Sequence, residues 1–449
     1  MASEPTLQAK CTAEFLGTFL LIFTIGCNVL GGSGVLAAVS IASVLMVSIY
    51  ALGGISGANF NPAVSFSLAM VNAMGGPGGM DMKTAGIYMF TQVIAGLAAA
   101  LCYCGLFWDT FNLAPAKGFG LVHAGLCEML YTFMLCFVVL NAAVAKQTMY
   151  YGLAIGYVIV AGAYGAGAVS GGCFNPAVAI GIDTSSAGLG FGWCLVYVVF
   201  ELIGAALAAV VFKLVRPGLF GGETEPGLAA KLTSEFLGTF MLVLTVGLNV
   251  LSNSPAGAFS IAASLMCMIF ALGDVSGAHF NPAVTCAILL CGRDKISLGD
   301  AVAYMATQIG AGVFAAATYS LIHHGESFAL GPVGTYGWGE VGVAEIVFTF
   351  VLCYVVLCVA VSEKTASPEF FGLAIGSCVT VGGFAIGGIS GGSLNPAVSA
   401  GIAAANHKGA WAMIPYTVFE LLGGAMAAGV FKFTHAADLE VKAAKEISA

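Results

Sequence analysis

The chain has 449 residues and a formal net charge of -8; 59% of its residues are hydrophobic and only 8% are charged. Ordinary soluble domains carry about 25% charged residues, so this composition excludes a water-soluble protein and predicts one that lies in a lipid bilayer. The sequence contains no cluster of basic residues, and nucleic acid is therefore excluded as a partner.

In chain order, the predicted elements are apolar blocks of about twenty residues, each long enough to cross ~30 Å of hydrocarbon. The first half contains such blocks at 12–30, 35–52, 84–107, 123–145 and 190–212. Shorter apolar segments of about ten residues also occur, and a helix of that length has to begin partway through the membrane. We predict six spanning helices and two short helices in each half of the chain, and twelve spans in all.

Each short segment begins with the same motif. The four phrases are SGANFNPAV (56–64), SGGCFNPAV (170–178), SGAHFNPAV (276–284) and SGGSLNPAV (390–398). The differences 281 − 61 and 395 − 175 both equal 220, so the second half repeats the first. The motif residues are Asn61, Pro62, Ala63, Asn175, Pro176, Ala177, Asn281, Pro282, Ala283, Asn395, Pro396 and Ala397.

A glutamate opens each quarter of the chain, in EFLGTF at 14–19 and 235–240, EMLYTF at 128–133 and EIVFTF at 345–350. Each quarter holds three spans, and an odd number inverts the second quarter of each half relative to the first. Inverted repeats are typical of transport proteins, with the solute path at the pseudo-two-fold axis. The predicted domains are a first barrel at 1–215, a cytosolic linker at 216–230, a second barrel at 231–435 and a cytosolic tail at 436–449.

The basic residues predict the orientation. If the amino terminus is cytosolic, twelve lysines and arginines fall on the inside and only Lys117 and Lys408 fall on the outside. The positive-inside rule favours this arrangement, which places both termini in the cytosol. The host membrane is expected to be either a plasma membrane or a vacuole-type membrane.

Asn-Pro-Ala is a signal for a helix start, because asparagine is a favoured N-cap and proline suits the first helical position. Two such half-helices in inverted repeat are expected to meet cap to cap near the midplane, with the positive ends of their dipoles at the centre. Each asparagine would aim an amide N–H at the lumen. A passing water would then accept two hydrogen bonds and turn its hydrogens outward, which interrupts a proton wire while the dipoles repel cations.

These phrases resemble the major intrinsic protein (aquaporin) family over essentially the whole chain, once in 1–220 and once in 221–449. The resemblance implies an all-α membrane protein with two tandem barrels, each of six transmembrane helices and two re-entrant half-helices. It also implies passive conduction of water. Because the family assembles four barrels, the resemblance further implies that two copies of this chain associate as a dimer that forms a pseudo-tetramer.

Four glutamates lie inside the apolar blocks, and an ionisable group in a span is a functional hypothesis by default. In the family, such glutamates brace the pore loops by accepting backbone N–H bonds. We favour that role over a proton relay, because a relay would need further titratable partners along the path. The residues are Glu14, Glu128, Glu235 and Glu345.

The resemblance also locates a selectivity filter at four positions in each barrel. These are Ile41, Ala163, Gly172 and Val178 in the first barrel and Ile261, Gly383, Gly392 and Val398 in the second. Most water-selective members have arginine where this chain has the two valines, and the region is similar to plant tonoplast intrinsic proteins. The expectation is a wide, apolar filter that passes water with glycerol, urea, ammonia or hydrogen peroxide.

Two other functions stay open from the sequence. A secondary transporter also has inverted repeats, although it normally couples to ions through charges at the midplane. A structural or junctional membrane protein with closed pores is the other alternative. An enzyme is not expected, because the sequence shows no nucleophile–base pair, metal cluster or phosphate loop; scattered cysteines without a CxxC pair predict no metal site and no cofactor.

Overall fold

A computed structural model of the chain describes residues 4–146 and 148–437. Within these ranges all regular elements are helical, and twelve of the helices are long and apolar enough to cross a membrane. The predicted all-α fold with twelve spans is therefore confirmed. The chain divides into two compact units with the main boundary between Pro226 and Gly227, and the short segment Ser254–Ala256 groups with unit 1.

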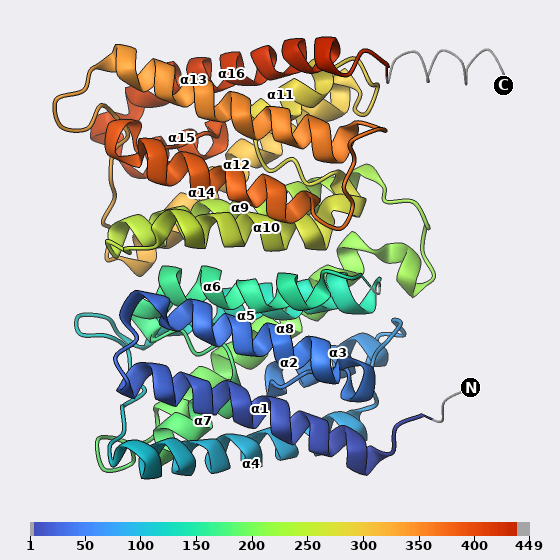
Figure 1. Cartoon of the computed structure of the whole chain (residues 1–449), viewed down its shortest axis with the longest axis vertical. Coiled ribbons are helices and arrows are strands. Elements are labelled where there is room, and N and C mark those ends of the chain that lie inside the picture. Colours follow the sequence, from blue (N-terminus) through green and yellow to red (C-terminus); the bar gives the residue numbers. More distant parts are fainter. Residues whose placement is uncertain (1–3, 147, 438–449) are drawn as a thin grey trace. The chain divides into compact units, whose positions relative to one another are not determined.

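Unit 1 holds helices α1–α8, coloured blue to green in Figure 1. Its long helices are α1 (Leu7–Leu30), α2 (Ala37–Ser56), α4 (Met82–Phe107), α5 (Leu121–Val139), α6 (Tyr151–Ser170) and α8 (Trp193–Val215). Its short helices are α3 (Pro62–Ala73) and α7 (Pro176–Ser185). The long helices pack in the order α4, α1, α2, α6, α5, α8. Both short helices pack on α4 and α8 and contact each other, so they lie where this series of long helices closes.

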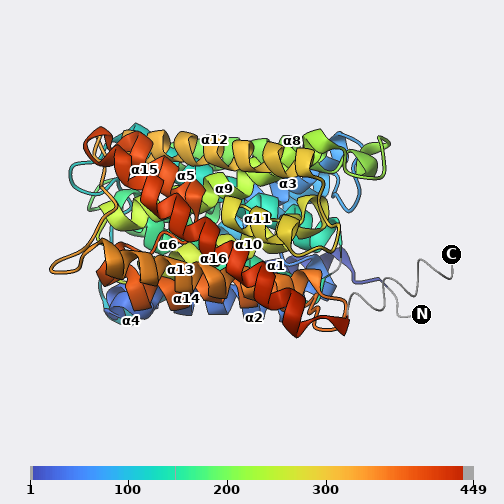
Figure 2. The same cartoon turned by 90° about the horizontal axis from the view of Figure 1, so that it is seen from above.

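Unit 2 repeats this plan with helices α9–α16. Its long helices are α9 (Leu228–Leu251), α10 (Gly257–Ser276), α12 (Leu298–Ile322), α13 (Trp338–Val356), α14 (Phe371–Ser390) and α16 (Met413–Thr434). Its short helices are α11 (Pro282–Leu290) and α15 (Pro396–Ala405). The short helix α11 packs beside α16 and α12, as Figure 2 shows from above. The predicted internal duplication therefore has a structural counterpart, element by element.

Helix boundaries differ from the prediction around the linker. In the range 216–230, a short 3-10 turn forms at Pro217–Phe220 and α9 already begins at Leu228. The segment LAAKL that follows Gly227 consists of strong helix formers, which explains the early start of α9. The predicted tail at 436–449 lies almost entirely outside the described residues.

The short helices begin where the motif predicts. Asn61 has an extended backbone (φ −155°), its side chain accepts a hydrogen bond from the N–H of Ala63, and Pro62 is the first helical residue. The preceding helix α2 ends at Gly57 with φ +91°, a left-handed conformation that glycine adopts without steric cost. The same glycine and asparagine caps recur at α6 and α7, α10 and α11, and α14 and α15. Each loop therefore turns sharply from a long helix into a short one.

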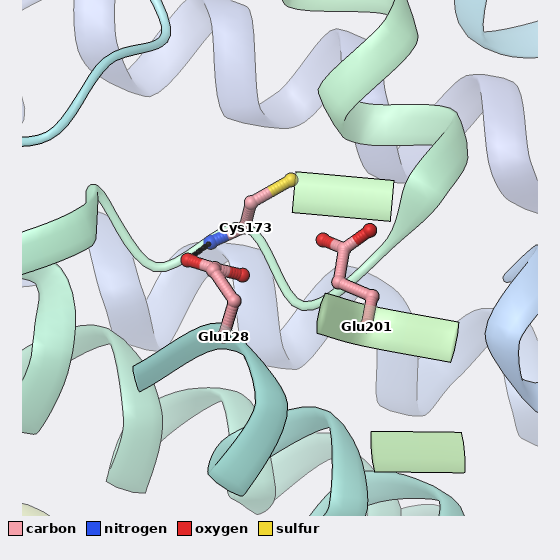
Figure 3. Close-up of side chains that lie close together, drawn as sticks. All are labelled: Glu128, Cys173 and Glu201. Carbon is pink, nitrogen blue, oxygen red and sulfur yellow. Dashed lines mark hydrogen bonds between the residues drawn. The ribbon is translucent and has the colours of Figure 1, made fainter. Parts of the chain in front are cut away.

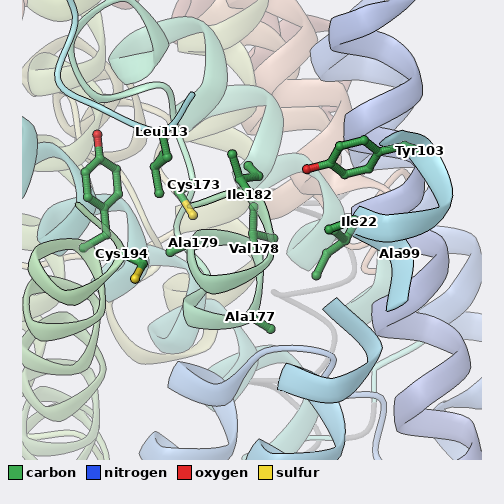
Figure 4. Packing of buried hydrophobic residues seen from close by; sticks show 12 residues of the cluster. Ile22, Ala99, Tyr103, Leu113, Cys173, Ala177, Val178, Ala179, Ile182 and Cys194 are labelled. Carbon is green, nitrogen blue, oxygen red and sulfur yellow. The ribbon is translucent and has the colours of Figure 1, made fainter. Parts of the chain in front are cut away.

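Glycines bring the short helices against their neighbours. A Cβ atom on Gly96 of α4 would lie 2.6 Å from the carbonyl oxygen of Ala177 on α7. In unit 2 a Cβ atom on Gly312 would lie 2.3 Å from the carbonyl oxygen of Ala397. Figure 4 shows the buried apolar cluster around α7, to which α1 contributes Ile22 and α4 contributes Tyr103. The absence of side chains at the two glycines lets the backbones touch at this point.

Replacing Gly312 by alanine is expected to lower the melting temperature of the protein in detergent by roughly 2–12 °C, because overpacking costs about 1–3 kcal/mol. The blocking atom is a backbone oxygen of the Asn-Pro-Ala motif, which cannot yield without moving α15. Gly310→Ala is the matched control, since a Cβ atom there meets nothing within 4 Å. Equal melting temperatures for the two variants would contradict the importance of this close contact.

Candidate pore and its supporting residues

The four Asn-Pro-Ala loops share a strained backbone. The residue immediately before each asparagine has a positive φ, between 50° and 55°, in Phe60, Phe174, Phe280 and Leu394. Left-handed backbone costs roughly 1–2 kcal/mol for a residue with a side chain. Such conformations persist where the surrounding structure holds them, and they cluster at functional sites. The loops therefore depend on contacts from outside themselves.

Reciprocal hydrogen bonds tie the two loops of unit 1 together. The side-chain amide of Asn61 donates to the carbonyl oxygen of Phe174 at 2.8 Å, and that of Asn175 donates to the carbonyl oxygen of Phe60 at 3.0 Å. The Oδ1 atom of each asparagine accepts the backbone N–H two residues further on. Each asparagine is thus a helix cap and a cross-link at the same time.

Unit 2 has the same arrangement. The amide of Asn281 donates to the carbonyl oxygen of Leu394 at 2.8 Å, and that of Asn395 donates to the carbonyl oxygen of Phe280 at 2.9 Å. An asparagine amide carries two N–H groups, and one of them is used in each of these cross-loop bonds. The second N–H of each amide is not used in these cross-loop bonds.

A cavity of about 390 Å³ lies beside the asparagine pair in unit 1, and both Asn61 and Asn175 line it. The remaining lining is largely apolar and includes side chains such as Leu21, Leu45 and Ile155. Asn61 and Asn175 therefore line a largely apolar cavity at the point where the two half-helices meet.

The four filter positions predicted for unit 1 all line this cavity: Ile41, Ala163, Gly172 and Val178. They come from α2, α6, the second loop and α7, so the fold brings together positions that are up to 137 residues apart (178 − 41). Gly172 has φ +70°, and a Cβ atom there would lie 3.3 Å from the Cα atom of Ala163. A larger residue at this position would therefore both strain the loop and press on α6.

In unit 2 the equivalent positions are Ile261 on α10, Gly383 on α14, Gly392 in the second loop and Val398 on α15. Gly383 stands where unit 1 has Ala163, and a methyl group would not fit at this position of unit 2. A Cβ atom on Gly383 would lie 2.6 Å from the Cβ atom of Ala258, so α10 occupies the space. The two units therefore differ in how α2 and α10 approach the filter.

Glu14 holds the first loop through four hydrogen bonds. Its Oε1 atom accepts from the hydroxyl of Ser56 at 2.6 Å and the backbone N–H of Asn59 at 3.0 Å. Its Oε2 atom accepts from the backbone N–H of Phe60 and the side-chain amide of Gln92, both at 2.8 Å. The left-handed residue Phe60 is thereby fixed by a buried carboxylate.

The other three predicted glutamates bind their loops in the same way. Each accepts the backbone N–H groups of the two residues that precede the asparagine, and all four glutamates have 0% exposure. The contacts are Glu128 with Cys173 and Phe174 (3.0 and 2.6 Å), Glu235 with His279 and Phe280 (3.0 and 2.8 Å), and Glu345 with Ser393 and Leu394 (3.1 and 2.9 Å). Each glutamate therefore holds its Asn-Pro-Ala loop in place by binding the backbone amides of that loop.

Two further buried glutamates, which were not among the predicted site residues, bind the second loop of each unit. Glu201 on α8 accepts the backbone N–H of Asn175 at 2.8 Å, and Glu420 on α16 accepts that of Asn395 at 2.9 Å. Figure 3 shows Glu201 close to Glu128 and Cys173. Both new glutamates stand in apolar spans and are 219 residues apart (420 − 201), which is the signal that would have identified them.

Fold and site together define a class of protein. Inverted repeats of helices place two capped half-helices end to end, joined by asparagines beside a largely apolar cavity. Irregular backbone at membrane depth is tolerated where it is buried in protein or lines a water-filled path. This is the architecture of a membrane channel with re-entrant half-helices.

The model of the major intrinsic protein family matches residues 1–152, 144–254, 248–431 and 372–448. The chain belongs to the major intrinsic protein family, which includes the aquaporins, and both of its halves are matched. Proteins of this family are channels and not enzymes, so passive conduction of water and small solutes is the function of this chain.

Several plant aquaporins are similar to about half of the chain. Aquaporin NIP1-3 of Oryza sativa subsp. japonica is 33% identical over 219 residues, which are 46% of this chain and 75% of that protein. Aquaporin NIP1-2 of Arabidopsis thaliana is 33% identical over 222 residues, or 45% of this chain and 74% of that protein. The expected likeness to tonoplast intrinsic proteins is not supported, since these relatives are named NIP. Valine after the second motif is one position and does not define a subfamily.

Among solved structures, the X-ray structure of the aquaglyceroporin from Plasmodium falciparum covers 46% of this chain and 96% of its own. The identity is 18% and the TM-score is 0.40. The match spans about one unit of this chain and adds nothing further to the assignment.

Proposed function

We propose that each unit forms its own pore, which conducts water and small neutral solutes and excludes protons at the paired asparagines. The observation that carries this proposal is the reciprocal pair of Asn61 and Asn175 beside a cavity of about 390 Å³. Each amide keeps one N–H for the lumen, so a water molecule there meets two donors and must direct its own hydrogens away. Hydrogen-bond donors and helix dipoles of this kind exclude protons and cations from aquaporin-type pores.

The proposed filter of unit 1 is apolar and has no fixed cation. Ile41, Ala163 and Val178 supply hydrocarbon and Gly172 supplies only backbone. Selectivity in such pores depends on diameter, on lining donors and on electrostatic barriers. A filter of this chemistry excludes small neutral solutes less strictly than one with arginine, which favours passage of glycerol, urea, ammonia or hydrogen peroxide.

Stopped-flow swelling of proteoliposomes tests the function. The purified full-length chain is expected to accelerate water flux over empty liposomes, and then flux in gradients of urea, glycerol or hydrogen peroxide. No acceleration for any of them would refute conduction and would support a structural role with closed pores. Flux that requires an ion gradient would instead indicate a secondary transporter.

Arginine at the proposed filter is expected to block the larger solutes. Val178→Arg and Val398→Arg, made separately and together, place a long cation at positions that are 2% and 3% exposed. The double variant is expected to lose glycerol and urea flux by roughly tenfold or more, which corresponds to a barrier increase of about 1.4 kcal/mol. Val178→Ile is the control for added volume without charge. Unchanged solute flux in the double variant would refute the proposed filter.

We further propose the orientation and assembly that the charges and the family favour. Both termini and the linker lie in the cytosol, in a plasma membrane or a vacuole-type membrane, with lysines and arginines concentrated on that side. Two chains associate to give four pores. Light scattering of the detergent-solubilised protein is expected to report a dimer of the full chain, and a stable monomer would contradict this assembly.

A further inference from the structure

The last spanning helix of each quarter of the chain presents one polar side chain to the bracing glutamate of that quarter. In the first quarter of each unit this residue is a glutamine, Gln92 on α4 and Gln308 on α12. In the second quarter it is a glutamate, Glu201 on α8 and Glu420 on α16. All four side chains have 0% exposure. The inverted repeat therefore places an amide and a carboxyl group in equivalent surroundings.

The glutamine is a neutral hydrogen-bond donor to the brace. The side-chain amide of Gln92 donates to Glu14 at 2.8 Å and to the hydroxyl of Ser65 at 3.0 Å. Gln308 repeats both bonds in unit 2, to Glu235 at 2.8 Å and to Thr285 at 3.0 Å. In these quarters the bracing carboxylate is thus met by an N–H and not by a second carboxylate.

In the second quarters, two carboxyl groups together hold three consecutive backbone amides. Glu128 accepts from the N–H groups of Cys173 and Phe174 with its two oxygens, and Oε1 of Glu201 accepts from that of Asn175. The other oxygen of Glu201, Oε2, is buried and has no hydrogen-bond partner. Atoms of Glu128, Cys173 and Glu201 lie within 4.8 Å of one another (Figure 3).

Two negative charges in this position would be costly. Two carboxylates that share a buried site do not both ionise, because the charges repel and neither is solvated. Within the described residues no cationic side chain forms an ion pair with either carboxyl group. Glu128 receives two N–H bonds, which favour its charged form, whereas Glu201 has an oxygen without a partner.

We propose that Glu201 and Glu420 carry a proton and act as positioning residues that fix the second Asn-Pro-Ala loop of each unit. The neutral acid matches the glutamine of the first quarters in offering a hydrogen to the brace, here from its hydroxyl group. Unlike the glutamine, it also accepts the backbone N–H of the pore asparagine with its carbonyl oxygen. The effect of this proton on the pore rests on the proposed function, whereas the protonation itself depends only on the fold.

Unit 2 supports the inference independently of the cysteine. Glu420 accepts from the N–H of Asn395 at 2.9 Å and from the hydroxyl of Ser399 at 3.0 Å, and its Oε2 atom is also buried without a partner. Glu345 holds the two preceding amides, and Ser393 stands where unit 1 has Cys173. Because the pair of glutamates is kept when the thiol is lost, a proton explains both units, whereas a metal ion held by the thiol would explain only one.

Infrared difference spectroscopy in proteoliposomes tests the protonation. The wild-type protein at neutral pH is expected to show the C=O stretching band of protonated, buried carboxyl groups, shifted by deuterium exchange. Glu201→Gln and Glu420→Gln are each expected to remove part of this band, and the double variant most of it. Glu223→Gln, in the exposed linker, is the control that leaves the band and the water permeability unchanged.

Hydrogen exchange tests the positioning. Glu201→Leu removes the acceptor of the Asn175 N–H, and exchange of the peptide that contains Asn175 is expected to accelerate about 5- to 30-fold. Glu201→Gln keeps a carbonyl acceptor and is expected to restore slow exchange.

An unchanged infrared band in the double glutamine variant would overturn the proposal. So would stoichiometric bound metal at Glu128 and Glu201, or equal exchange in Glu201→Leu and Glu201→Gln. Neither the infrared band nor the hydrogen exchange depends on conduction. An impermeable wild-type protein would therefore contradict the proposed function, but it would not affect the test of the protonated glutamates.

Discussion

Replacing Glu14 by leucine is expected to stop conduction through the first unit and to destabilise that unit severely. The carboxylate accepts four hydrogen bonds from Ser56, Asn59, Phe60 and Gln92, and all four donors are buried there. Each buried donor left without a partner costs about 1–3 kcal/mol. The sum approaches the total stability of an ordinary domain, which is about 5–15 kcal/mol.

The backbone of the loop makes this loss larger. Ala58 and Phe60 both have left-handed φ values of 52°, and the carboxylate of Glu14 binds the amide of Phe60 directly. Without the brace the loop is free to relax to an extended backbone. Relaxation would withdraw the carbonyl oxygen of Phe60 from Asn175, so the damage reaches the second loop as well.

The measurement is water permeability of proteoliposomes together with thermal unfolding in detergent. Glu235→Leu is the matched variant in unit 2, where the same four contacts recur. If the two pores are independent, each single variant is expected to lose about half of the permeability and the double variant all of it. Wild-type permeability and melting temperature in Glu14→Leu would rule out the bracing role.

Much of this fold follows from simple features of the sequence. Apolar blocks of membrane length identify the spans, and Asn-Pro-Ala identifies the short helices, because both signals are local. The four bracing glutamates were also predicted, since a charged residue in an apolar block stands out. The exact ends of the helices were harder to predict, since α9 begins at Leu228, inside the range predicted as a linker.

The contacts that could not be predicted involve backbone atoms or long-range packing. The cross-loop acceptors are carbonyl oxygens of Phe60 and Phe174, and a carbonyl oxygen is present at every residue. Gly383 stands where unit 1 has Ala163, and the neighbouring helix lies so close to it, through Ala258, that a methyl group would not fit. Whether a missing methyl group becomes open space depends on whether the surroundings collapse, and this is not encoded at the position itself.

Serine in place of the pore asparagines is expected to admit protons while preserving the half-helices. Serine is a good N-cap, so Asn175→Ser keeps an acceptor for the N–H of Ala177 and α7 still forms. The substitution removes both amide N–H groups, the one that reaches Phe60 and the one proposed to face the lumen. Asn175→Ala removes the cap as well and is expected to cost a further 0.5–2 kcal/mol or so of stability.

Asn175→Ser and Asn175→Ala distinguish the loss of proton exclusion from the loss of the helix cap. Proton flux, followed with a pH-sensitive dye inside proteoliposomes, is expected to rise relative to water flux in Asn175→Ser, because a water in the lumen then meets one donor in place of two. Asn395→Ser is the matched variant in unit 2, where Asn395 donates to Phe280 in the same way. If the variant with serine at Asn61, Asn175, Asn281 and Asn395 still conducts water and still excludes protons, the asparagines serve only as caps and cross-links. Proton exclusion would then have to come from the dipoles of the half-helices alone, which serine leaves in place.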